Sequence, residues 1–237
     1  MEKTIFNLFR GYSDKRPSET TLAHLLYLIR EDQTVKNHTE KHRYYRSEGM
    51  QTSADREKAS CPCFAVAVRF SGGKQQKHID SWTGFSLADL DHVPVEQMQE
   101  VLQRIRRDEH TALAYVTMSG EGIRILFRIE MPMQGLSATR KVERYKKAFQ
   151  AANEYYARLT GVECDGRCKN PTRLSGLAAD SDVFFNPEAV PFSFSAKDLE
   201  PVRNGKLERV TAAINRELKQ AGVVYEAHHR NNYIMRT

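Results

Sequence analysis

Two apolar stretches joined by a glycine-containing turn place the strongest constraint on how this chain can fold. ALAYVTMS (112–119) and GIRILFRIEM (122–131) each predict a strand, and Gly120-Glu121 between them suits a tight hairpin. Apolar residues then recur at helical spacing from about Ser137 to Leu159. The expected buried stripe of this helix consists of Val142, Tyr145, Phe149, Ala152, Tyr156 and Leu159. The remaining elements must pack around an antiparallel hairpin and a long amphipathic helix.

Further strands are expected on both sides of this hairpin. FAVAVRF (64–70) predicts one strand, followed by a turn over residues 71–76. SWTGFSLADLDHV (81–93) predicts a second strand that ends before Pro94, a residue suited to the first turn of a helix. The apolar side of that helix would carry Val95, Met98, Leu102 and Ile105. Short strand-like pieces are expected around 172–174 and 183–185.

Other helices are expected near the two ends of the chain. One runs from about Glu19 to Arg30, with Ser18 as its N-cap, and another from about 205 to 220. The polar residues 33–60 have little periodicity, so they fit either a mobile segment that contacts nucleic acid or a solvated helix and loop. We divide the chain into a domain over 1–200 and a helical extension over 201–237 that begins a downstream domain.

The composition excludes several classes of protein. With 237 residues and 40% hydrophobic residues the chain can bury a core, yet its apolar runs fall far short of the roughly 18 residues that span a bilayer. The N-terminal residues are too charged for a signal peptide, and four Cys fit a reducing compartment, so we expect a cytoplasmic protein with no membrane partner. An excess of 36 basic over 30 acidic residues permits a polyanionic partner.

Asp89-Leu90-Asp91 interrupts an otherwise apolar strand. Side chains two residues apart on a strand share a face, with Cα atoms roughly 6.6 Å apart, so both carboxylates can converge on one site. A divalent cation would compensate two such acids, and two-ion phosphoryl transfer uses a pair of this kind. The alternative is a strand end at which the two Asp meet solvent or cap the following helix.

Two further segments could bind an anion. Gly120 and Gly122 would let backbone N–H groups approach a phosphate that Arg124 also meets, although a plain hairpin turn explains them equally. Asp165 could add a third acid, with Lys169 and Arg173 supplying charge for a triphosphate. A surface loop of ion pairs is the alternative for this last segment.

The cysteines suggest zinc only weakly. Cys61-Pro62-Cys63 and Cys164-x3-Cys168 supply four sulfurs, but neither spacing is that of a usual zinc knuckle, and zinc is therefore disfavoured. The histidines have no metal-ligand spacing. The sequence also contains no P-loop and no recognisable nucleophile motif.

Three segments in order resemble the signature blocks of the archaeo-eukaryotic primase superfamily. They are GFSLADLDHV, VTMSGEGIRILFRI and ECDGRCKNPTRLSGLAADSDVFFNP. The likeness covers roughly residues 20–195. It is greatest to the primase-polymerase-like domain at the N-terminus of virulence-associated protein E type proteins of mobile elements and prophages. This resemblance implies an α+β fold with a core of two packed units, the second with an RRM-like antiparallel sheet, flanked by helices.

The resemblance also implies roles for individual residues. Asp89, Asp91 and Asp165 match the catalytic acids, which hold Mg²⁺ or Mn²⁺ in the cleft between the two units. The residues that match nucleotide-binding positions are Ser119, Gly120, Gly122, Arg124 and Arg173, and Lys169 joins them on charge. Many members of the superfamily have His at the position of Arg124. If Arg124 and Arg173 face the cleft, they form a cationic wall opposite the acids; otherwise Arg124 pairs with Glu121 or Glu130.

The implied function is that of a DNA primase or primase-polymerase. Such a domain transfers nucleotides from nucleoside triphosphates onto DNA along a single-stranded template, in replication of a mobile element or prophage, with a helicase-type ATPase as partner. One alternative is a catalytically inactive module that binds single-stranded DNA or an origin, which Arg124 in place of His favours. A metal-dependent nuclease is a third possibility, but the sequence offers no general base near the acids.

Overall fold

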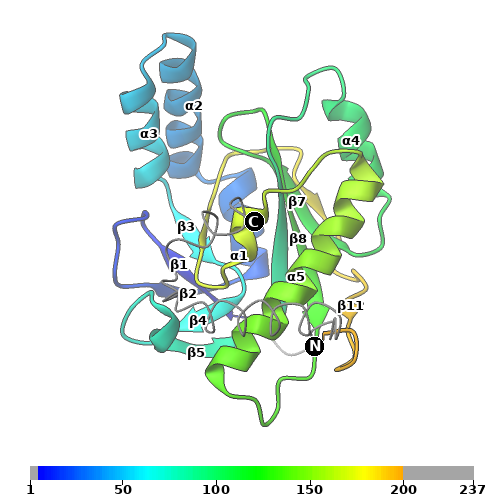
Figure 1. The fold of residues 1–237 in the computed structure, drawn as a ribbon. Coiled ribbons are helices and arrows are strands. Elements are labelled where there is room, and N and C mark those ends of the chain that lie inside the picture. Colours follow the sequence, from blue (N-terminus) through cyan, green and yellow to red (C-terminus); the bar gives the residue numbers. More distant parts are fainter. Residues whose placement is uncertain (1–4, 200–237) are drawn as a thin grey trace, which may run out of the picture. The chain divides into compact units, whose positions relative to one another are not determined.

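The computed structural model describes residues 5–199, and these residues form an α+β fold, as expected (Figure 1). The expected helix over 205–220 and the extension over 201–237 lie outside the described residues. Most of the strands pair antiparallel, in two larger sheets and one small sheet. None of the described helices combines the length and the apolarity that crossing a bilayer requires.

The first sheet joins strands from distant parts of the sequence. Its order is β2 (Ser18–Thr21), β1 (Ile5–Phe9), β3 (Cys63–Ala65) and β9 (Leu174–Gly176), all antiparallel. The expected strand around 172–174 is therefore β9, two residues later. The pairing of β3 with β9 brings the segment after Asp165 beside the N-terminal third of the chain.

The second sheet contains the hairpin that the sequence predicted. β7 (Thr111–Val116) and β8 (Ile123–Glu130) pair antiparallel, and β6 (Phe85–Leu90) pairs antiparallel with β8. Two short strands complete the sheet, β10 (Phe184–Phe185) on β7 and β11 (Phe192–Ser193) on β8. Every residue of β6 is buried, so Asp89 lies within a covered strand.

Two segments that were each expected to form one strand form two. Residues 64–70 divide into β3 and β4 (Val68–Phe70), and residues 81–93 divide into β5 (Ile79–Trp82) and β6. β4 and β5 make the small third sheet, and Gly84, with a φ of +74°, separates β5 from β6. The pattern could not show this change of sheet, because residues 63–68 are buried throughout and do not alternate.

The first helix begins later than expected. Residues 18–21 form β2, since they pair with β1, a short strand that the sequence pattern did not predict. α1 (Leu22–Arg30) follows, and its N-cap is Thr21, whose side chain accepts a hydrogen bond from the backbone N–H of His24 at 3.3 Å. Ser18 is therefore not the cap.

Residues 33–60 form two packed helices, which agrees with the solvated-helix alternative. They are α2 (Gln33–Ser47) and α3 (Gln51–Ser60), and they extend side by side from the rest of the fold (Figure 1). His38 Nδ1 lies 2.7 Å from Glu57 Oε2 and joins the two helices. Arg43 on α2 donates to the carbonyl of Met118 at 3.2 Å, which ties α2 to the turn between β7 and β8.

The remaining helices cover the second sheet. α4 (Met98–Arg106) buries Leu102 and Ile105 but leaves Val95 before its start, 86% exposed. α5 (Ala138–Thr160) agrees with the expected range of about 137–159, is capped by Ser137, and crosses in front of β7 and β8 in Figure 1. The expected stripe on α5 is buried except for Leu159, which is half-buried. Short 3₁₀ helices form at η1 (Gln76–His78) and η2 (Gly166–Lys169).

Candidate functional site

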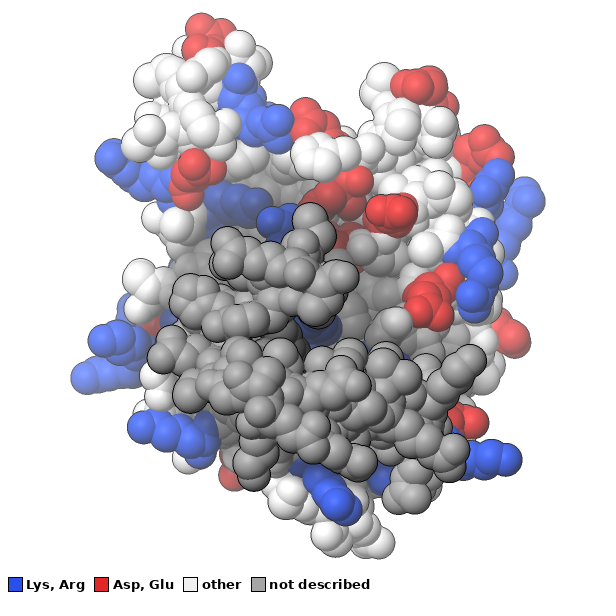
Figure 2. Space-filling view, viewed as in Figure 1, with Lys and Arg blue, Asp and Glu red and all other residues white. Residues whose placement is uncertain are grey.

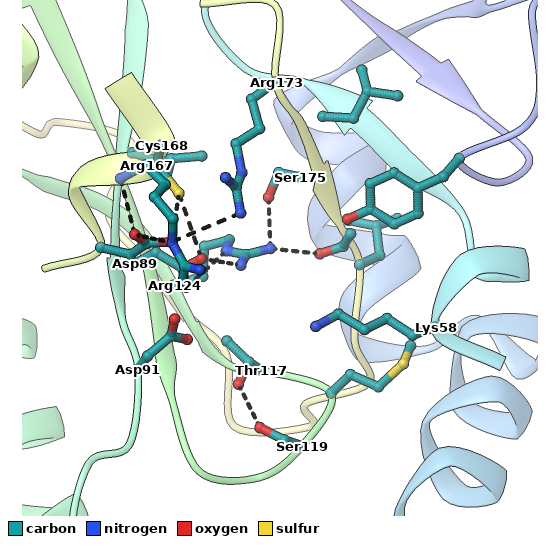
Figure 3. Close-up of a pocket in the computed structure, with 17 residues that line it drawn as sticks. Lys58, Asp89, Asp91, Thr117, Ser119, Arg124, Arg167, Cys168, Arg173 and Ser175 are labelled. Atoms are coloured by element: carbon teal, nitrogen blue, oxygen red, sulfur yellow. Dashed lines mark hydrogen bonds and ion pairs between the residues drawn. The ribbon is translucent and has the colours of Figure 1, made fainter. Parts of the chain in front are cut away.

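A cavity of about 520 Å³ is lined by residues from both larger sheets and from α3 (Figure 3). Its charged lining consists of Asp89, Asp91, Asp165, Lys58, Arg124, Arg167 and Arg173. Four cations therefore surround three carboxylates. All three sequence-predicted acids lie here, with Ser119, Arg124 and Arg173 among the predicted nucleotide-binding residues.

Asp89 and Arg124 form an ion pair across adjacent strands. They are register partners on β6 and β8, with side chains only 4% and 16% exposed. Arg124 Nε donates to Asp89 Oδ1 at 3.3 Å and Nη2 donates to Oδ2. Arg124 Nη1 donates to Ser175 Oγ at 3.0 Å and to the carbonyl of Gly176 at 3.3 Å, both on β9. One guanidinium thus joins the two larger sheets.

Arg124 therefore differs from its expected arrangement. The sequence suggested a wall opposite the acids, or a pair with Glu121 or Glu130. The structure instead pairs Arg124 with Asp89 itself, because antiparallel register places the two side chains on one face of neighbouring strands. Glu121 pairs with Arg46 of α2 at 3.1 Å.

A backbone hydrogen bond joins Asp165, the third acid, to Asp89. The N–H of Asp165 donates to the carbonyl of Asp89 at 2.8 Å. Asp165 Oδ1 accepts from the N–H and the Nε of Arg167, both at 2.9 Å, and Oδ2 lies 3.8 Å from Arg173 Nη2. Burial alone would raise the pKa of Asp165, but the two hydrogen bonds from Arg167 hold it below the usual value.

Asp91 differs from the other two acids. It directly follows β6, is exposed, and forms no ion pair with any residue in the part of the chain that the structure describes. Because one side of its carboxyl is shielded from water by the cavity wall, the pKa of Asp91 is raised, and the nearby charges of Asp89 and Asp165 raise it further. Asp91 is therefore the carboxylate open to a bound cation or donor.

Some lining residues were not among the predicted site residues. Lys58 lies in the last turn of α3 and Tyr12 follows β1, while Cys168 and Ser175 come from the third block. Burial raises the pKa of Tyr12 to about 12. Lys58 was not predicted because α3 has no clear apolar face, so the sequence does not show which side of it faces the protein.

The glycines of the turn between β7 and β8 have a structural role. Gly120 has a φ of +80°, and its N–H donates to the carbonyl of Thr117 at 2.9 Å. The N–H of Glu121 donates to Ser119 Oγ at 3.3 Å. A Cβ on Gly122 would lie 2.6 Å from the carbonyl oxygen of Leu90. Neither glycine lines the cavity, so turn geometry and close packing account for both.

Lys169 also lies away from the acids. It lines a separate cavity of about 570 Å³ with residues of α5, such as Lys146 and Lys147.

Cys168 lies on the side of the acids. In the 3₁₀ turn of η2, residues three apart lie on one side, so Cys168 faces the same way as Asp165. Cys168 Sγ is 3.8 Å from Asp89 Oδ2.

The four cysteines are free thiols. Burial raises the pKa of each thiol to about 12. Cys61 and Cys63 lie near the start of β3, whereas Cys164 and Cys168 flank Asp165. Within residues 5–199, no group of three or more His, Cys, Asp or Glu side chains is arranged to hold a metal ion.

Comparison with known proteins gives one family and one similar structure. The family described as "BT4734-like, N-terminal domain" matches residues 56–185. The AEP domain of the Cyanophage S-2L primase-polymerase (PrimPol) is similar at 12% identity with a TM-score of 0.38, over 83% of this chain and 86% of that chain. No curated protein matches. Because the family match spans more than half of the sequence, this chain belongs to the BT4734-like N-terminal domain family.

Proposed function

We propose that this protein is a primase-polymerase-like domain that binds a nucleoside triphosphate and transfers its nucleotidyl group onto DNA. The observation that carries the proposal is the convergence of three distant sequence blocks on one cavity. Asp89 and Asp91, Ser119 and Asp165 come from separate parts of the chain and line the same space. The volume of about 520 Å³ is within the usual range of small-molecule sites, about 300–1,000 Å³.

The charges of the cavity suit a phosphate ester that carries a cation. Lys58 and Asp91 lie on opposite sides of the cavity (Figure 3). Figure 2 shows basic groups on the α2–α3 side of the cavity and acidic groups on the opposite side. In this proposal Arg173 binds phosphate oxygens. Arg124 fixes the orientation of Asp89, and Asp91 lies nearest to the reacting groups.

A bound Mg²⁺ or Mn²⁺ would neutralise charge on the phosphates during transfer. Asp91 has the ligand type that these ions prefer and is open to one. Asp89 and Asp165 are already engaged by guanidinium groups, so a cation would have to compete with Arg124 or Arg167 for those oxygens. The described residues thus fit a single cation at Asp91 better than a preformed site for two ions.

The proposal extends to the biological setting. The resemblance to the virulence-associated protein E type supports a role in replication of a mobile element or prophage. Single-stranded DNA would be the template, and a helicase-type ATPase would act with the protein.

An extension assay tests this function. The full chain is incubated with a primed single-stranded template, labelled NTPs or dNTPs, and Mg²⁺ or Mn²⁺, with and without a helicase-type ATPase. We expect extended products to fall more than about 10- to 100-fold in Asp91→Asn, because loss of a group that only supports a metal ligand already has an effect of that size. Asp80→Asn, an exposed Asp outside the cavity, is the control. No product under any condition would refute catalysis.

The second candidate is a non-catalytic module that binds single-stranded DNA or an origin. The pairing of Arg124 with Asp89 favours it, because this pair occupies both oxygens of one predicted catalytic acid. DNA binding that is unchanged by divalent cations and by Asp91→Asn, together with no extension, would select this candidate.

A further inference from the structure

Lys58 differs from every other cation around the cavity. Arg124, Arg167 and Arg173 each lie within ion-pair distance of Asp89 or Asp165. Among residues 5–199, no carboxylate or carbonyl oxygen accepts a hydrogen bond from the ammonium group of Lys58. Figure 3 shows this group directed into the cavity, across from Asp91. All three of its N–H donors are therefore available to a ligand.

The fold fixes the place from which Lys58 extends. The N–H of Tyr12 donates to the carbonyl of Ala59 at 2.9 Å, and a Cβ on Gly11 would lie 2.9 Å from that same oxygen. The segment after β1 thus packs closely on the end of α3. On the side of α3 that faces α2, the side chain of Glu57 hydrogen-bonds His38. The backbone at Lys58 is held from two directions, although its side chain is exposed.

Arg124 is less able to bind a ligand than the sequence suggested. It donates two hydrogen bonds to Asp89 and two to β9, and its side chain is 16% exposed. Releasing it for a phosphate would leave Asp89 buried without its partner, which is costly. Lys58 has no such partner to give up in the described structure.

We infer that Lys58, at the end of α3, binds the phosphate chain of the nucleoside triphosphate, in the role that the sequence assigned to Arg124. This inference rests on the proposed function and adds a specific residue to it. A compact ammonium group with three donors suits clustered phosphate oxygens. Removal of the Lys58 ammonium group should therefore weaken the binding of a triphosphate more than that of a monophosphate.

Titration calorimetry tests the inference. Wild-type protein, Lys58→Gln and Lys41→Gln are titrated with a non-hydrolysable nucleoside triphosphate and with the corresponding monophosphate. Lys41 is an exposed lysine of α2 that does not line the cavity, so it controls for loss of net charge. We expect Lys58→Gln to weaken triphosphate binding roughly tenfold, the monophosphate less, and Lys41→Gln to leave both unchanged.

The outcomes separate this inference from the proposed function. If wild-type protein binds no triphosphate, the proposed function fails, and the inference with it. If wild-type protein binds and Lys58→Gln binds equally well, only the inference is wrong. A loss of single-stranded oligonucleotide affinity in Lys58→Gln, with triphosphate affinity unchanged, would assign Lys58 to the DNA backbone instead. Thermal unfolding of each variant verifies that it is folded.

Discussion

Arg124 stands opposite Asp89 in the β8–β6 register and hydrogen-bonds both oxygens of its carboxylate, while the same guanidinium holds Ser175 and Gly176 of β9. Tyr115 of β7 also contacts β9 at this point, since its hydroxyl donates a hydrogen bond to the carbonyl of Gly176 at 2.9 Å. The candidate site is therefore also a point at which the two larger sheets are joined. Substitutions here should affect stability as well as ligand binding.

Arg124→Met should destabilise the protein strongly. It removes the partner of a carboxylate that is 4% exposed, and breaking a buried pair in this way costs about 3–5 kcal/mol. Asp89→Asn combined with Arg124→Met should recover part of the loss, because no buried charge is then left unpaired. Urea unfolding of the single and double variants measures the coupling, and strictly additive effects would contradict the ion pair.

Gly122→Ala should lower stability by about 1–3 kcal/mol, because a Cβ would lie 2.6 Å from the carbonyl oxygen of Leu90. Gly166→Ala is the matched control, since nothing lies within 4 Å of a Cβ at that position. The control should change the free energy of unfolding by less than about 0.5 kcal/mol. Equal effects in the two variants would mean that β6 and the turn are not in close contact.

Stability should fall on mild acidification through His42 of α2. Burial lowers the pKa of this ring below its ordinary value of 6.5, and the nearby positive charge of Lys58 lowers it further. The folded state keeps His42 neutral, so as pH drops below about 6.5 the unfolded state takes up the proton first and stability is lost.

Unfolding at pH 7 and pH 5 tests this titration. His42→Gln should reduce the difference in unfolding free energy between the two pH values. A pH dependence identical to that of the wild type would mean that folding does not lower the pKa of His42.

Arg173→Gln should weaken triphosphate binding without unfolding the protein. Its side chain is 45% exposed and 3.8 Å from Asp165, so the ion pair contributes little to stability, about 0–1 kcal/mol. A charge-assisted contact to phosphate is worth about 1.5–3 kcal/mol, which corresponds to a tenfold or greater loss of affinity. Calorimetric titration beside Arg140→Gln, an exposed arginine of α5 outside the cavity, makes the comparison. Matching affinities in both variants would remove Arg173 from the site.

Local patterns in the sequence determined the elements with a clear period or cap. The hairpin of β7 and β8 and the long helix α5 match their predicted ranges within a few residues, because turn glycines, alternation and helical spacing act over short distances. The sequence also indicated which acids to examine, since Asp89 lies in a strand that is otherwise apolar.

The tertiary structure alone decided how those acids are paired. Antiparallel register set Asp89 against Arg124, and the pairing of β3 with β9 brought Ser175 to the same guanidinium. The division of residues 64–70 between two sheets, and the entry of Lys58 into the cavity, likewise depend on contacts between distant segments. A one-dimensional pattern records which residues can be buried, but not which strand or side chain they will meet.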